Sequence, residues 1–243
     1  MNLEIKLKGE NLSKSFRKKN AEQKSLIFDG MDLSIKTGSF MGLMGPSGCG
    51  KSTLLKIMAG LETPDSGSVF VDEKVVIFKD GKLRMSDVEF AAYRRKHFGF
   101  IFQSHQLIPE LTVLENIILP LQINGLSKKT AKKRAKEMLS NVNLLDKLQD
   151  SFPQEISVGQ QQRVGIARAL IHKPSLIFAD EPTASLDPTN SVEVVNLLLG
   201  LQEEYDSTIL MVTHTPELVG GLDGVLKFVA EAESGTYRLD KTI

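Results

Sequence analysis

The stretch that decides the fold covers residues 45–53 and reads Gly45-Pro46-Ser47-Gly48-Cys49-Gly50-Lys51-Ser52-Thr53. It fits the pattern G-x-x-x-x-G-K-[ST] and lies between an apolar run at 40–43, a predicted strand, and a predicted helix at 54–59. In this context the glycines let successive backbone N–H groups turn inward and hold phosphate oxygens. Lys51 can reach the β- and γ-phosphates, and the Ser52 hydroxyl can coordinate Mg²⁺. Residues 45–53 are therefore predicted to bind a nucleotide, with Lys51 also catalytic and Ser52 also a metal ligand.

Cys49 is the one cysteine of the chain and lies inside this loop. A single cysteine cannot form an internal disulfide, which agrees with a reducing compartment. In the simpler interpretation, Cys49 is a small residue that fits the loop. In the alternative, its position at a helix start lowers the pKa of the thiol and makes it reactive. In that case alkylation blocks ATP binding and ATP protects the thiol.

Two adjacent carboxylates follow a continuous apolar run at 175–179, which is typical of a buried parallel strand. They are Asp180 and Glu181, and the carboxyl ends of parallel strands are where ligands bind. Asp180 is predicted to hold Mg²⁺, directly or through water, and Glu181 to orient or deprotonate the attacking water. Taken alone, the pair is equally compatible with a solvated strand end. Its place downstream of a phosphate loop favours function.

Length and composition describe a globular α/β chain. Its 243 residues fit one large domain, or one domain with an inserted subdomain, and 25% charged with 41% apolar residues is near average. The net charge is zero, which disfavours a broad nucleic-acid surface. No apolar run approaches the roughly 18 residues needed to span a bilayer, and residues 1–10 contain no apolar signal core. We expect a cytosolic protein that works at a membrane only through a partner.

Periodicity divides the chain into three parts. The first part predicts strands at 3–12 and 30–35, two more strands between 67 and 78, a polar loop at 17–25, a turn at 80–81 and a helix at 86–96. The middle predicts helices at 110–123, interrupted by Pro120, and at 127–148. The last part alternates strand and helix, with a helix at 191–205 and a buried strand at 208–213. Alternating strands and helices imply a parallel sheet covered on both faces.

Further motifs follow in order along the chain. Gln103 ends the run GFIFQ, Ile156-Ser157-Val158-Gly159-Gln160 precedes QQQRVGIARAL, the acids continue as DEPTASLD up to Asp187, and His214 follows TILMVT. From about residue 12 to 226, this ordered set resembles the ATPase subunits of ATP-binding cassette (ABC) transporters. The resemblance implies an α/β P-loop NTPase fold: an ABC ATPase core with a mostly parallel sheet, an antiparallel β portion and an inserted helical subdomain. It implies one nucleotide-binding domain over 1–243, with the core at 1–103 and 161–243 and a helical subdomain with the signature loop at 104–160.

The same resemblance implies roles for single residues. Phe16 looks like the aromatic that stacks on adenine, although a core aromatic on a strand is the alternative. Gln103 matches the glutamine that contacts Mg²⁺ and the lytic water, and His214 matches the histidine that contacts the γ-phosphate. Asp187 resembles the acid whose loop crosses the dimer interface.

Residues 156–160 resemble the signature loop, usually LSGGQ, which binds the γ-phosphate held by the opposite protomer. Ser157, Gly159 and Gln160 are the matching binding residues, and a helix start suits an anion there. Val158 replaces the first glycine. A position that needed positive φ would penalise this β-branched residue. We expect the replacement to be tolerated, with slower hydrolysis as the alternative.

The implied mechanism uses ATP and Mg²⁺ between two cassettes, which are a second copy or a similar chain. ATP closes the dimer, Glu181 directs water at the γ-phosphate, and a transmembrane permease converts closure into movement of a substrate. The stretch HQLIPELTVLENIILPL resembles the lipoprotein-release and macrolide-export branch. We expect a peripheral protein on the inner face of the cell membrane, with no nucleic-acid partner. The alternative is a mechanical or signalling ATPase that acts on a membrane protein without moving a solute. A cassette ATPase acting on ribosomes or DNA is disfavoured, because those relatives usually carry two cassettes or a coiled-coil insertion.

Overall fold

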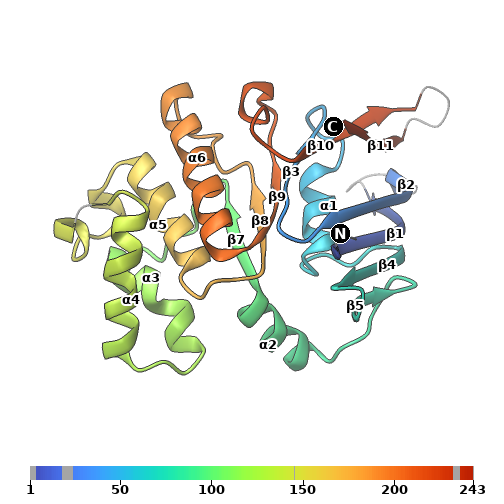
Figure 1. Ribbon diagram of the computed structural model, residues 1–243. Helices are drawn as coiled ribbons and strands as arrows, with labels where there is room; N and C mark the ends of the chain where they lie inside the picture. Colours follow the sequence, from blue (N-terminus) through green and yellow to red (C-terminus); the bar gives the residue numbers. More distant parts are fainter. Residues whose placement is uncertain (1–3, 18–23, 145, 232–235, 243) are drawn as a thin grey trace. The chain divides into compact units, whose positions relative to one another are not determined.

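The computed structural model describes residues 4–17, 24–144, 146–231 and 236–242. It divides into two compact units, which are described separately (Figure 1). Unit 1 joins residues up to Ala91 with those from Thr208 onward, and unit 2 runs from Ala92 to Ser207. Among the described residues, no helix has both the length and the apolar character needed to cross a membrane.

Unit 1 contains a sheet with an antiparallel part and a parallel part, in the strand order β6-β5-β4-β1-β2-β11-β10-β3-β9. The antiparallel part consists of β1 (Ile5–Arg17), β2 (Lys24–Lys36), β4 (Ser66–Val71), β5 (Val75–Lys79) and β6 (Lys82–Leu83). The parallel part consists of β3 (Phe40–Met44), β9 (Thr208–Val212) and β10 (Gly224–Ala230). The last strand, β11 (Tyr237–Thr242), pairs antiparallel with β10 and parallel with β2, and so joins the two parts.

One helix, α1 (Lys51–Met58), packs against this sheet and buries its apolar face. Strand β9 is buried at all five positions and β3 at its first four, as expected for apolar runs covered on both faces. A 3-10 turn at Pro216–Leu218 follows β9. The apolar sequence runs of unit 1 therefore form its core around β3 and β9.

Unit 2 combines two parallel strands with helices. The strands are β7 (Phe98–Phe102) and β8 (Leu176–Asp180). The helices are α3 (Val113–Ile123), α4 (Lys128–Asn141), α5 (Val158–Leu170) and α6 (Pro188–Tyr205), with 3-10 turns at Asp146–Leu148 and Pro153–Glu155. Helices α3, α4 and α5 pack against one another (Figure 1). Helix α2 (Asp87–His97) contains the boundary between the two units.

The helix predicted at 127–148 is shorter than expected and ends at Asn141. Asn143 adopts the left-handed conformation with φ of 55°, and the N–H groups of Asn143 and Leu144 donate to the carbonyls of Ser140 and Leu139. This is a Schellman ending, in which asparagine tolerates the left-handed backbone. The prediction followed the apolar spacing and overlooked this stop signal.

Two other predictions need correction, and two strands were missed. The first two strands are longer than predicted: β1 reaches Arg17 and β2 starts at Lys24, while residue 3 and the loop residues 18–23 lie outside the described residues. Helix α3 starts at Val113 and continues through Pro120 without interruption. The C-terminal strands β10 and β11 were not predicted. The remaining predicted helices and strands occur, with their ends shifted by a few residues.

Candidate nucleotide-binding and hydrolysis site

The phosphate loop leaves the end of β3 and enters α1 as predicted. The Lys51 ammonium is buried and donates hydrogen bonds to the carbonyl oxygens of Gly45 at 2.9 Å and Pro46 at 2.8 Å. The lysine at the start of α1 therefore reaches across the loop to its first two residues.

At Gly45 and Gly50 this loop has no room for a side chain. Gly45 has φ of 155° and packs on Phe228 of β10, where an added Cβ would lie 2.6 Å from the Phe228 Cβ. Gly50 has φ of 103° and is the N-cap of α1. As a glycine, it offers no side chain that could cap the N–H groups of the first turn. The start of a helix presents N–H groups and a positive dipole end to an anion. The loop consequently has the backbone form of a phosphate site.

His214 lies at the same edge of the sheet as this loop. Leu43 of β3 is paired with Val212 of parallel β9, and the Thr213 N–H donates to the Leu43 carbonyl at 3.2 Å. Strands β3 and β9 are parallel and end at the same edge of the sheet. The phosphate loop and the exposed residue His214, which follow these strands, therefore lie side by side within unit 1.

Phe16 lies on β1, opposite Ser25 of β2. The residue is 42% exposed, which rules out the alternative of a core aromatic. The Lys14 ammonium lies 4.9 Å from the ring centroid and is itself held by Glu62 at 2.6 Å. The Phe16 ring is thus contacted by Lys14 and remains partly open to solvent.

Cys49 is fully buried against Gly45. Burial raises the pKa of its thiol, and the opposing effect of Lys51 is smaller. The alternative of a thiol activated by a lowered pKa is therefore wrong in direction. Cys49 fits the simpler interpretation of a small residue that fills the loop.

In unit 2, three of the residues predicted for metal binding or hydrolysis lie at one sheet edge. Strands β7 and β8 are parallel, and Phe102 is paired with Asp180. Gln103 and Glu181 follow these two positions directly, so all three polar side chains lie at the carboxyl ends of neighbouring strands. Glu181 has the left-handed φ of 46°, an unusual conformation that recurs at functional sites.

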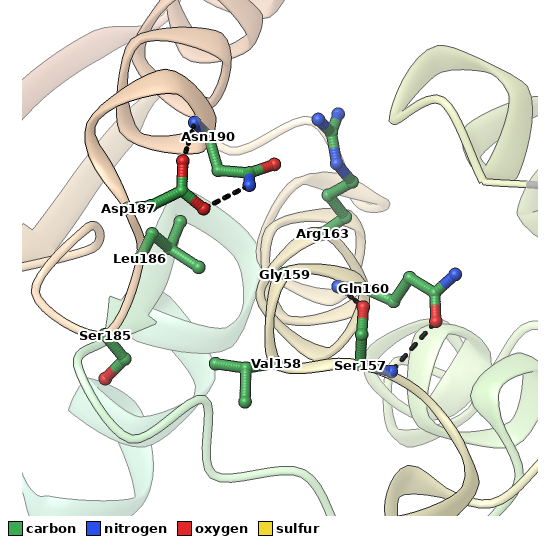
Figure 2. A pocket seen from close by; sticks show the side chains of 9 residues that line it. All are labelled: Ser157, Val158, Gly159, Gln160, Arg163, Ser185, Leu186, Asp187 and Asn190. Carbon is green, nitrogen blue, oxygen red and sulfur yellow. Dashed lines mark hydrogen bonds between the residues drawn. The ribbon is translucent and has the colours of Figure 1, made fainter.

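Ser157 and Asp187 cap two helices that line one cavity of about 320 Å³ (Figure 2). Ser157 is the N-cap of α5: it accepts from the Gln160 N–H at 3.3 Å, and its own N–H donates to the Gln160 side chain at 2.9 Å. Asp187 is the N-cap of α6 and accepts from the Asn190 N–H at 3.1 Å and the Asn190 side chain at 2.5 Å. These hydrogen bonds from Asn190, the side-chain one first, lower the pKa of Asp187.

Gly159 leaves this cavity open, since a Cβ there would meet Leu186 and Asn190 only at 4.0 Å. Two further lining residues, Arg163 and Asn190, were not predicted. Arg163 forms an ion pair with Glu193 at 2.6 Å. The motif Asp187-Pro-Thr-Asn190 is typical of a helix start and could have indicated from the sequence that Asn190 lies beside Asp187. No local sequence signal indicated Arg163.

Val158 is the first residue of α5, and it is absent from the residues with positive φ. The residue is 47% exposed. The backbone conformation at this position is therefore one that a β-branched residue can adopt. This agrees with the expectation that valine is tolerated here.

The donors suggested for Mg²⁺ are the Ser52 hydroxyl, the Gln103 amide oxygen and the Asp180 carboxylate. All are hard oxygen ligands, the type that Mg²⁺ takes together with nucleotide phosphates. Within the described ranges, no group of three or more His, Cys, Asp or Glu side chains could hold a metal ion by itself. The donor set fits a nucleotide-bound Mg²⁺.

A phosphate loop, two acids at the end of a parallel strand and a capped signature helix together define a nucleotide-hydrolysing cassette. Residues 28–184 match the ABC transporter family. The chain is 41% identical over 228 residues to the lipoprotein-releasing system ATP-binding protein LolD of Bacteroides thetaiotaomicron, covering 91% of this chain and 99% of the relative. It is 39% identical to the bacitracin export ATP-binding protein BceA of Halalkalibacterium halodurans, covering 86% of this chain and 79% of that protein.

Among solved structures, the chain resembles a dimeric, post-hydrolysis state of the ATP-binding cassette MJ0796 bound to ADP and Pi. The TM-score is 0.81 at 37% identity, covering 91% of this chain and 93% of the other. The chain belongs to the ABC transporter family. It is an ATP-binding and ATP-hydrolysing subunit of the kind found in these transporters. The predicted fold class is confirmed.

Proposed function

We propose that this chain powers a membrane permease of the lipoprotein-release or drug-export kind, from the inner face of the cell membrane. The observation that carries this proposal is the 41% identity to LolD, which extends over 99% of that relative. The similarity to a bacitracin export protein supports the same branch. Residues 104–160 are then the helical subdomain that meets the permease.

In this proposal two copies close around two nucleotides. Residues 45–53 hold the phosphates of ATP in one copy, while Phe16 stacks on the adenine. The cavity between Ser157 and Asp187 offers a hydroxyl and a helix start, which suit the γ-phosphate held by the other copy.

The hydrolytic roles divide among a few side chains. Glu181 orients the attacking water or takes its proton, and His214 contacts the γ-phosphate. Lys51 offsets negative charge that develops on the phosphate. Ser52, Asp180 and Gln103 are the residues that would hold Mg²⁺, which supplies further charge compensation when bound.

The test is a tagged pull-down of this chain from detergent-solubilised native membranes, with the bound proteins identified by mass spectrometry. We expect a multi-helix membrane protein with a large extracytoplasmic domain. A matched pull-down with Lys51→Ala separates permease binding from nucleotide binding, because the permease should remain bound. Recovery of a sensor-type membrane protein would favour a mechanical or signalling ATPase instead. Recovery of ribosomal or DNA-repair proteins alone would overturn the transporter role.

A further inference from the structure

Arg168, near the end of α5, holds the loop that follows Gln103 through two hydrogen bonds. Its two terminal nitrogens donate to consecutive carbonyl oxygens, Nη2 to His105 at 2.8 Å and Nη1 to Gln106 at 2.7 Å. The planar guanidinium suits two parallel hydrogen bonds, which a lysine ammonium cannot reproduce with the same geometry. Among the described residues, Arg168 has no acidic partner, so its charge faces these two carbonyl dipoles.

The loop that Arg168 holds has an unusual backbone. His105 and Gln106 are consecutive non-glycine residues in the left-handed region, with φ of 57° and 47°. Such conformations are costly and persist only where surrounding contacts hold them. Arg168 supplies two of those contacts, at the point where the loop turns away from Gln103.

A second set of contacts involves the same face of α5. The backbone of Gly165 faces the His105 carbonyl. A Cβ added to Gly165 would lie 3.6 Å from that carbonyl oxygen. Gln162 is buried one turn earlier, near the buried imidazole of His105. Residues 162, 165 and 168 therefore present one continuous face of α5 to the loop.

Helix α5 thus connects two parts of the predicted site. The signature serine Ser157 is its N-cap, and its last turn contains Arg168. We propose that Arg168 is a positioning residue for hydrolysis, which sets Gln103 by fixing its loop to the signature helix. A shift of α5 that accompanies contact with the second nucleotide would then be passed to Gln103. This inference rests on the hydrolytic role proposed above for Gln103.

The test is a double-mutant cycle of steady-state ATPase activity with Gln103→Ala, Arg168→Ala and the double variant. We expect Arg168→Ala to lower kcat by about tenfold while KM for ATP stays within about twofold, because nucleotide binding uses other residues. If Arg168 acts through Gln103, the double variant should be no slower than the slower single variant. Arg168→Lys should recover only part of kcat. Lys173→Ala, which removes an exposed cation just beyond α5, is the matched control and should leave kcat unchanged.

Three outcomes would overturn the inference: an unchanged kcat in Arg168→Ala, equal losses in kcat and ATP affinity, or losses that multiply in the double variant. An unchanged kcat in Gln103→Ala would instead remove the role proposed for Gln103, and the inference with it. If Arg168→Ala fails to fold, amide hydrogen exchange of Arg168→Lys replaces it. Residues 103–106 should then exchange about tenfold faster than in the parent, and equal rates would contradict the inference.

Discussion

Phe102 and Asp180 are paired residues at the carboxyl ends of two neighbouring parallel strands. The residues that follow them, Gln103 and Glu181, come from segments almost 80 positions apart in the sequence, yet they leave the sheet at one edge. The Gln103 amide, predicted to bind water or metal, and the Glu181 carboxylate, which can accept a proton, are thereby brought to the same sheet edge. The pairing of β7 with β8 therefore determines that Gln103 is the polar residue at the end of the strand next to Glu181.

Glu181→Gln should lower kcat by roughly 10²–10⁴-fold, because the amide cannot accept a proton from water. ATP binding should persist, so the variant should accumulate as an ATP-bound dimer. Size-exclusion chromatography with light scattering, with and without ATP, measures this directly. Glu137→Gln, an exposed change on α4, should behave like the parent protein. A Glu181→Gln chain that stays monomeric with ATP would count against the dimer mechanism.

Phe16→Ala should weaken ATP binding because the exposed ring loses its stacking partner. Stacking of a base on an aromatic contributes about 1–3 kcal/mol, so we expect Kd to rise by about 5- to 150-fold. Phe16→Tyr should bind like the parent, since it keeps the aromatic face. Fluorescence titration with a nucleotide analogue measures both variants. Phe152→Ala, which removes another partly exposed phenyl ring, is the control, and unaltered affinity in Phe16→Ala would refute the stacking role.

Cys49 should react slowly with alkylating reagents at neutral pH. Burial raises the pKa of the thiol, so the reactive thiolate is scarce until the pH rises above the range of an ordinary cysteine. We expect labelling of the folded chain to be at least about tenfold slower than labelling in denaturant, and to speed up with increasing pH. Mass spectrometry of timed samples measures the rate. Labelling at the rate of a free thiol would show that the loop opens in solution.

Val158→Gly should not increase the ATPase rate, because Val158 already has a helical backbone conformation. Glycine is a poorer helix former than valine by about 0.4 kcal/mol, so the variant should be slightly less stable. Parallel measurements of kcat and of denaturant unfolding separate the two effects. A clear gain in kcat would mean that the side chain obstructs closure of the dimer.

Asp187→Ala should destabilise the start of α6 in a pH-dependent way. The folded pKa of Asp187 is lowered, so its capping contribution is present above the ordinary pKa of an aspartate and is lost as pH falls through the folded pKa. The Tm of the variant should lie below that of the parent at neutral pH, and the difference should shrink in acid. Glu203→Ala on the same helix is the control. A Tm difference that does not depend on pH would contradict the assigned ionisation.

Local signals in the sequence explain most elements that were predicted correctly. Short apolar runs identified β3, β8 and β9, and the N-cap residues Ser157 and Asp187 precede helices that the structure contains. The prediction failed where a local signal was overlooked, as with Asn143, or where pairing depends on remote partners. Strand β11 is such a case, because its neighbours β2 and β10 set its place in the sheet.

By itself, the sequence determined the family and the phosphate loop, and it predicted roles for Asp180 as a metal ligand and for Glu181 as a catalytic acid, because each depends on residues close together along the chain. Only the tertiary structure decided that Cys49 is shielded, that Phe16 is exposed and that Val158 is helical. It alone brought Arg168 to His105, 63 positions away, and Ser157 to the same cavity as Asp187. Such contacts depend on how distant segments pack, since burial, charge and backbone strain at one residue are set by neighbours that its own sequence context does not specify.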